Sequence, residues 1–194
     1  MPLILASTSP IRRSMLEAAG VEHVAMSPDV DEDKVKQAHD SGSSCGASPA
    51  LELAEAKALS LHHPGAFIIG SDSTLGVDGQ LYSKPRDRDE AARHLAAFSG
   101  RTMILSSAVA LARDGVVEWS LVDQARLTVR DLSPAFIDAY LDREWPAVAY
   151  CVGVFRMEGP GVMLFDAVEG SHFTILGLPL LPLLGALRAR GLAV

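Results

Sequence analysis

Short apolar runs along the chain, each ending at polar or glycine-containing residues, predict buried strands. Continuous runs cover residues 3–5, 67–69, 148–155 and 162–166. Alternating apolar and polar positions on both sides of Asp114-Gly115 indicate a longer hairpin, with strands expected over 103–112 and 116–129.

Serine, aspartate and proline residues mark where helices begin. Such starts stand at Ser9-Pro10, Ser48-Pro49, Asp87 with Glu90 as a capping box, Ser133-Pro134, and Pro179. The helices should end near residues 20, 62, 100 and 191. Residues 27–48, first acidic and then rich in serine and glycine, predict a long mobile loop. The alternation predicts an α/β protein with one twisted, mixed sheet flanked by helices.

Length and composition narrow the class of protein. The 194 residues suggest one domain over 1–194, or one domain with two lobes. A net charge of −7 argues against nucleic acid polymers and anionic membranes as partners. We expect a cytoplasmic protein, since no apolar run approaches membrane-spanning length and the first ten residues lack signal-peptide features. Cys45 and Cys151 are expected to be free thiols, with a disulfide as the alternative in an oxidising compartment.

Two arginines stand at the start of the first predicted helix, where the helix dipole disfavours cations. A bound anion would reverse that penalty for Arg12 and Arg13. The hydroxyls of Ser7 and Ser9 and the free helical N–H groups are suitable donors to phosphate. The alternative is a capped surface helix with solvated arginines.

Lys57 shares a helix face with apolar residues. It follows Leu53 and Ala54 and precedes Leu61 at spacings of three and four, so its ammonium should rise from the apolar face. It either extends past the edge of the core to solvent or waits in a cleft for an anion.

Asp72 follows the strand at 67–69, at the end where open α/β sheets tend to place ligand chemistry. The Asp78-Gly79 turn decides which residue faces it. A three-residue loop over 77–79 pairs Asp72 with Lys84, whereas a two-residue loop pairs Lys84 with Ser73. We favour the first, because a carboxylate and an ammonium on one face can form a metal and phosphate site. A plain cross-strand ion pair is the alternative.

Acidic residues elsewhere supply further candidates. The cluster Asp29, Asp31, Glu32 and Asp33 offers hard oxygen ligands for Mg²⁺, or is merely solvated. Glu158 lies beside a glycine in a turn, where it could be a simple loop acid.

Several of these motifs occur together, and in this order, in a known family. They are Leu5-Ala6-Ser7-Thr8-Ser9-Pro10 with Arg12, Asp31-Glu32, Leu53-Ala54-x-x-Lys57-Ala58, Gly70-Ser71-Asp72, Lys84-Pro85-Arg86, Ser99-Gly100-Arg101-Thr102, Glu169-Gly170-Ser171 and Gly177-Leu178-Pro179-Leu180. On these residues the chain resembles the Maf family of nucleoside triphosphate pyrophosphatases. The resemblance implies an elongated Maf/ITPase-like α/β fold with a cleft between two lobes, a divalent metal such as Mg²⁺ or Mn²⁺, and a possible homodimer.

The resemblance also implies roles for individual residues. It maps functional positions onto Arg12, Glu32, Lys57, Asp72, Lys84 and Glu158. We expect hydrolysis of a nucleoside 5′-triphosphate to the monophosphate and pyrophosphate. Asp72 is then the general base or principal metal carboxylate, Glu32 a second acid at the metal, and Lys84 a further catalytic residue. Ser7, Ser9, Arg12, Lys57 and Lys84 would bind the triphosphate.

The segment from Cys151 to Gly159 is most similar to the branch of the family that hydrolyses 7-methyl-GTP, because Glu158 stands where the dTTP and UTP branch has glutamine. Three positions depart from the pattern: Ile11 replaces arginine or tryptophan, Ser73 replaces glutamine, and Ser83 replaces glycine. We therefore predict 7-methyl-GTP as substrate. The alternatives are dTTP or UTP, or a non-enzymatic nucleotide-binding regulator of cell division.

Overall fold

One mixed sheet organises the computed structural model, which describes residues 2–32, 34–35 and 48–192. Its strand order is β2-β1-β3-β5-β6-β7, with β4 paired to β3. The chain divides into two compact units. Unit 1 comprises Met1–Ser73, Ser106–Asp123 and Ser171–Val194, and unit 2 comprises Thr74–Leu105 and Gln124–Gly170. The strands β3 (Phe67–Val77), β5 (Thr102–Arg113) and β6 (Val116–Val129) contribute residues to both.

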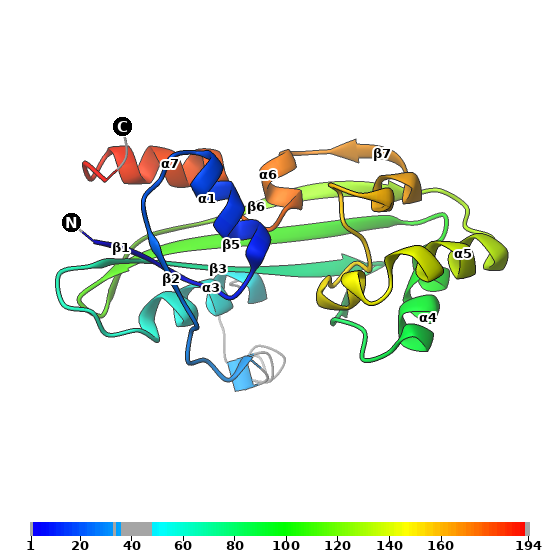
Figure 1. Cartoon of the computed structure of the whole chain (residues 1–194), viewed down its shortest axis with the longest axis horizontal. Helices are drawn as coiled ribbons and strands as arrows, with labels where there is room; N and C mark the ends of the chain where they lie inside the picture. Colours follow the sequence, from blue (N-terminus) through cyan, green and yellow to red (C-terminus); the bar gives the residue numbers. More distant parts are fainter. Residues whose placement is uncertain (1, 33, 36–47, 193–194) are drawn as a thin grey trace. The chain divides into compact units, whose positions relative to one another are not determined.

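In unit 1, helices cover both faces of a parallel part of the sheet. The strands β1 (Leu3–Ala6) and β2 (Val24–Met26) pair in parallel, and β1 pairs in parallel with β3. Figure 1 shows α1 (Pro10–Ala18) and α7 (Leu180–Arg188) above these strands and α3 (Pro49–Leu59) below them.

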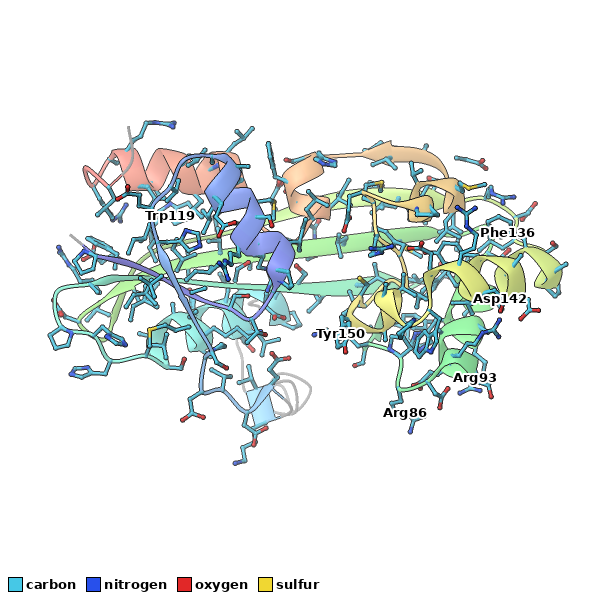
Figure 2. All side chains as sticks on the ribbon, in the orientation of Figure 1. Arg86, Arg93, Trp119, Phe136, Asp142 and Tyr150 are labelled. Atoms are coloured by element: carbon cyan, nitrogen blue, oxygen red, sulfur yellow. The ribbon has the colours of Figure 1, made fainter. Side chains whose placement is uncertain are left out.

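Two of the apolar clusters among the described residues differ clearly in character. Large residues of α1, α7, β1, β3 and β5 form the main core, and Trp119, labelled in Figure 2, packs against it. Between α3 and β5 the core consists of alanines, three from each element: Ala50, Ala54, Ala58, Ala108, Ala110 and Ala112. Small side chains let α3 lie very close to the sheet.

Unit 2 contains the antiparallel parts of the sheet and two longer helices. Its elements are β4 (Gln80–Tyr82), α4 (Arg88–Phe98), α5 (Pro134–Glu144), β7 (Phe165–Glu169) and the 3₁₀ helices η1 (Ala147–Tyr150) and η2 (Pro160–Leu164). The short helix α6 (His172–Ile175) belongs to unit 1. No helix among the described residues is long and apolar enough to cross a membrane.

The predicted helix starts and the mixed α/β class are confirmed. The side chains of Ser9, Asp87 and Ser133 each accept a hydrogen bond from a backbone N–H three residues on. The capping box at Asp87 is only half formed, because the Glu90 carboxylate accepts the backbone N–H of Arg86. Within the predicted loop at 27–48, residues 32 and 34–35 are helical, and residues 36–47 lie outside the described part of the chain.

Three strand predictions are wrong. The strand from Phe67 does not stop at 70–72 but continues to Val77, so Asp72 lies inside β3 rather than at its end. The run 148–155 forms part of η1 and turns, and 162–166 is mostly η2, with β7 starting at Phe165. Short apolar runs are compatible with any buried backbone, and here tertiary packing selects 3₁₀ turns.

The favoured hairpin register is also wrong. Val77 pairs with Gln80, which leaves the two-residue loop Asp78-Gly79, whose φ angles of 49° and 81° match a type I′ turn. Asp72 therefore does not face Lys84, and the ladder ends at the pair Leu75 and Tyr82. The hairpin at Asp114-Gly115 is confirmed.

Candidate functional site

A buried lysine joins two carboxylates in unit 1. The Lys57 Nζ lies 2.5 Å from Oδ1 of Asp72 and 2.7 Å from Oε1 of Glu32. The side chains of Lys57 and Asp72 are 8% and 12% exposed, whereas that of Glu32 is 40% exposed. The prediction from the helical spacing is thus confirmed: the ammonium of Lys57 does rise from the buried face of α3, where two carboxylates bind it.

Local sequence explains how Lys57 reaches Asp72. Ala50, Leu53, Ala54, Lys57 and Ala58 form the buried face of α3. A Cβ atom on Gly70 would stand 2.0 Å from the carbonyl oxygen of Ala54, so only glycine lets α3 lie this close to β3. Two residues further along β3, Asp72 points to the same face as Gly70 and meets Lys57.

The guanidinium of Arg12 donates hydrogen bonds to two oxygen atoms in other segments of unit 1. Its Nε donates to the carbonyl of Gly177 at 2.7 Å, and its Nη2 donates to Oγ of Ser73 at 3.2 Å. Burial lowers the pKa of Arg12, and the charges of Asp72 and Glu32 oppose that shift. Arg13, in contrast, is exposed and pairs with Glu17 at 2.8 Å.

The serines before α1 shape the turn into the helix. The hydroxyl of Ser7 is buried and accepts the backbone N–H of Ser9, and Ser9 caps the helix through the N–H of Arg12. Ser7, Ser9 and Arg13 also line a pocket between the start of α1 and residues 25–27.

The described residues of the acidic run at 29–33 contact different partners. Glu32 reaches Lys57, whereas Asp31 forms an ion pair with Lys34 on the surface, and the N–H of Asp29 donates to Ser60. Asp33 lies outside the described residues. The contact of Glu32 could not be predicted, because its partner comes from α3.

Asp72 and Glu32 are suitable ligands for a hard divalent cation. Magnesium typically takes one or two protein carboxylates and completes its shell with water and substrate phosphates. Two carboxylates gathered on one ammonium provide such a pair. Within residues 2–32, 34–35 and 48–192, no three His, Cys, Asp or Glu side chains converge as a cage. The donor set fits Mg²⁺ or Mn²⁺ held partly through the substrate.

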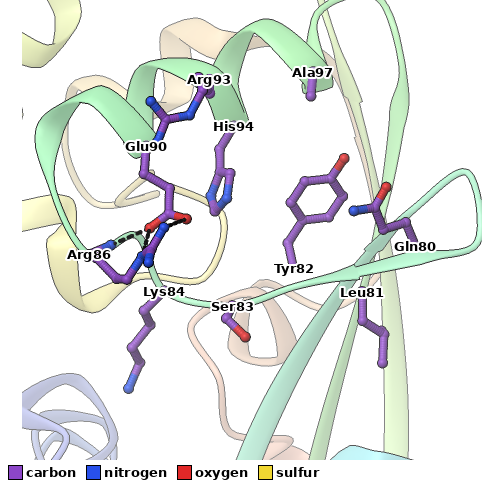
Figure 3. Close-up of a pocket in the computed structure, with 10 residues that line it drawn as sticks. All are labelled: Gln80, Leu81, Tyr82, Ser83, Lys84, Arg86, Glu90, Arg93, His94 and Ala97. Carbon is purple, nitrogen blue, oxygen red and sulfur yellow. Dashed lines mark hydrogen bonds and ion pairs between the residues drawn. The ribbon is translucent and has the colours of Figure 1, made fainter. Parts of the chain in front are cut away.

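Lys84 lies in unit 2, in the segment between β4 and α4, and its side chain is exposed. Figure 3 shows it extending away from the neighbouring pair Arg86 and Glu90. Hydrogen bonds from Arg86 hold the pKa of Glu90 down at about 2. Ser83, the departure from the family pattern, is exposed beside Lys84.

Glu158 is exposed in a turn, and the segment just before it is hydrogen-bonded to two residues of α5. Arg156 donates through Nε and Nη2 to Oε2 of the buried Glu144, at 3.0 and 2.8 Å. The hydroxyl of Tyr140 donates to the carbonyl of Val154 at 2.9 Å. Sequence reasoning missed Glu144 and Tyr140, although a charged residue on the apolar face of a predicted helix is a signal.

The two remaining specificity candidates have structural partners. Ile11 is partly buried against the main core of unit 1. Ser73 bonds to Arg12 and, at 2.8 Å, to Ser107. The contacts of Gly177 with Arg12 and of Ser107 with Ser73 were not predicted, since these partners come from distant parts of the chain.

Comparison with known proteins decides the family. The family profile described as "Maf-like protein" matches residues 2–190. The chain belongs to the Maf family. Among curated Maf relatives, a nucleoside triphosphate pyrophosphatase of Nitrobacter hamburgensis is 47% identical, over 98% of this chain and 95% of its own.

Two further relatives carry a more specific name. The 7-methyl-GTP pyrophosphatase of Brucella suis is 45% identical, over 96% of this Maf chain and 94% of its own. That of Rhizobium meliloti is 44% identical, over 97% and 96%. Among solved structures, a nucleoside-triphosphatase (dITP/XTP pyrophosphatase) from Mycobacterium abscessus is 22% identical, with a TM-score of 0.43, over 68% of this chain and 76% of its own.

Proposed function

We propose that this Maf protein hydrolyses a nucleoside 5′-triphosphate to the nucleoside monophosphate and pyrophosphate. The observation that carries the proposal is the buried Lys57 shared by Asp72 and Glu32, with Arg12 in the same unit. Relatives that are 44–47% identical over nearly the whole chain are named as pyrophosphatases. They support the same reaction here.

Each residue of the site has a chemical task in this reaction. A water oxygen attacks the α-phosphorus, the bond from that phosphorus to the bridging oxygen breaks, and pyrophosphate leaves. Asp72 accepts the proton that the water gives up. Lys57 orients Asp72 through the bond from Nζ to Oδ1. Arg12 donates to phosphate oxygens while Gly177 and Ser73 hold its guanidinium.

Charge balance argues for a divalent cation. Arg12 and Lys57 carry two positive charges, and Asp72 and Glu32 carry two negative ones, so the four charges cancel and leave the triphosphate uncompensated. When bound by Asp72 and Glu32, Mg²⁺ or Mn²⁺ would neutralise charge that develops on the phosphate oxygens. In this proposal the ammonium of Lys84 supplies a further positive charge to the triphosphate.

The base that this protein prefers is 7-methylguanine. An ionised carboxylate only accepts hydrogen bonds, so Glu158 can receive the N1–H and N2–H₂ donors of guanine. Uracil and thymine present one N–H between two carbonyl oxygens, which a carboxylate repels. Methylation at N7 makes the guanine ring cationic and strengthens its attraction to Glu158. Two of the relatives are named for 7-methyl-GTP.

Pyrophosphate release from purified full-length protein tests the reaction. The panel is 7-methyl-GTP, GTP, dTTP and UTP, each with Mg²⁺ or Mn²⁺. The matched control is Asp72→Asn, which keeps the shape of the side chain but can neither take a proton nor supply a charged ligand. We expect it to lose about 10²- to 10⁴-fold in activity. Wild-type release no faster than that of Asp72→Asn would refute the proposal, as would release of orthophosphate in place of pyrophosphate.

A further inference from the structure

Two serine hydroxyls and one backbone carbonyl, from three segments of unit 1, form a hydrogen-bond chain that ends on Arg12. Arg12 Nη2 donates to Ser73 Oγ at 3.2 Å, and Ser73 Oγ lies 2.8 Å from Ser107 Oγ. Ser107 Oγ in turn lies 2.8 Å from the backbone carbonyl of Thr174 in α6. The side chain of Thr174 donates to Asp123 on β6, so α6 is itself fixed to the sheet.

The number of protons gives this chain one direction. A carbonyl has no proton, so the contact between Ser107 and Thr174 must use the only hydroxyl proton of Ser107. The contact between Ser73 and Ser107 must then use the proton of Ser73. A guanidinium only donates, so Ser73 accepts from Arg12. Each hydroxyl therefore gives one hydrogen bond and receives one.

The surroundings leave these groups few alternatives. Ser107 and Thr174 are fully buried. The other Arg12 acceptor, Gly177, has a φ of +93°, and a Cβ atom there would lie 3.2 Å from Ser73 Oγ and 3.4 Å from Arg12 Nη2. The proton of Ser73 is committed to Ser107, so Ser73 presents Arg12 with a fixed lone pair.

We infer that Ser107 is a positioning residue for the triphosphate: it orients the Ser73 hydroxyl, which aims the guanidinium of Arg12. This inference rests on the proposed function in one respect, the contact of Arg12 with phosphate. Without Ser107 the Ser73 proton loses its acceptor and the hydroxyl can turn. Ser73 then no longer presents a fixed lone pair to Arg12, whose bond to Gly177 remains. Ser73 thereby acts on the phosphates through Arg12. Its hydroxyl proton is not available for a hydrogen bond to the nucleobase of the substrate.

Steady-state kinetics of Ser107→Ala test the inference. The matched control is Ser120→Ala, which removes a 2.8 Å hydroxyl bond to Glu55 elsewhere in unit 1. Arg12 binds phosphate both before and during the reaction, so we expect Ser107→Ala to raise KM about 3- to 10-fold with kcat within about twofold. A merely structural defect lowers the active fraction and hence the apparent kcat, but leaves KM unchanged.

Two further measurements separate the possible failures. In an Arg12→Ala background, Ser107→Ala should raise KM no further; a rise of the same size there would overturn the inference. Hydrogen exchange of the Arg12 Nη2 protons, which donate to Ser73, followed by NMR and assigned by their loss in Arg12→Ala, should become at least about threefold faster in Ser107→Ala. Unchanged exchange, or faster exchange with unchanged KM in an active enzyme, would overturn it. If wild type releases no pyrophosphate while exchange responds, the proposed function fails and the positioning of Arg12 by Ser107 stands.

Discussion

Removing the ammonium of Lys57 is the sharpest test of how the site is held together. In Lys57→Met the apolar stem can keep its packing on α3, but Asp72 and Glu32 lose the cation at 2.5 and 2.7 Å. Breaking a buried ion pair on one side typically costs about 3 to 5 kcal/mol, because a charge is left uncompensated. Asp72, with a side chain 12% exposed, takes most of this cost, while Glu32, at 40%, can turn to solvent.

This loss is large for a protein of 194 residues. Domains are stable by about 5 to 15 kcal/mol, and 1 kcal/mol shifts the Tm of a protein of this size by about 2 to 4 °C. We therefore expect Lys57→Met to lower the Tm by about 6 to 20 °C. Urea denaturation should show the same loss in unfolding free energy, with an unchanged dependence on urea.

Two companion variants make the test specific. Lys34→Met removes the exposed ion pair with Asp31 and should cost at most about 1 kcal/mol. Lys57→Met combined with Asp72→Asn removes the buried charge along with its partner, so the double variant should be more stable than Lys57→Met alone. The reasoning fails if Lys57→Met is no less stable than Lys34→Met, or if adding Asp72→Asn brings no recovery.

Two predictions concern unit 2. Glu158→Gln should lower the kcat/KM ratio of 7-methyl-GTP over UTP by about 10- to 150-fold, since it removes charge-assisted hydrogen bonds; Glu169→Gln is the control, and equal ratios in wild type and Glu158→Gln would contradict the assignment. Burial, and then the charge of Glu158, raises the pKa of Cys151 to about 11. In Cys45→Ser protein at pH 8, iodoacetamide should therefore alkylate Cys151 about 100-fold more slowly than in urea, where the thiol has its ordinary pKa. Equal alkylation rates in the native and unfolded protein would refute the prediction. Because the pKa of Cys151 is higher in the folded than in the unfolded protein, the thiol contributes to stability below about pH 9, and that contribution is lost as pH rises towards 11.

Signals that act within one turn of the chain could be interpreted from the sequence. Ser9 and Ser133 cap their helices as predicted because the capped N–H lies three residues away. The spacing of Lys57 placed its ammonium on the buried face of α3 for the same reason. The order of the motifs indicated the Maf family, which the match over residues 2–190 confirms.

Partners brought together from distant segments could not be predicted in this way. Asp72 lies inside β3 because this strand continues beyond Gly70, its last partner on β1, beside β5 and into its pairing with β4 at residues 75–77. The turn-forming residues 70–72 do not reveal this pairing. The register at Asp78-Gly79 depends on which of two possible loops the paired strands stabilise. The bonds from Arg12 to Ser73 and Gly177 join residues 61 and 165 positions apart. Sequence alone determined which residues carry charge and which helix faces are buried, whereas tertiary packing decided which charges meet, because the energy of an ion pair or hydrogen bond depends on distance in space and not on separation along the chain.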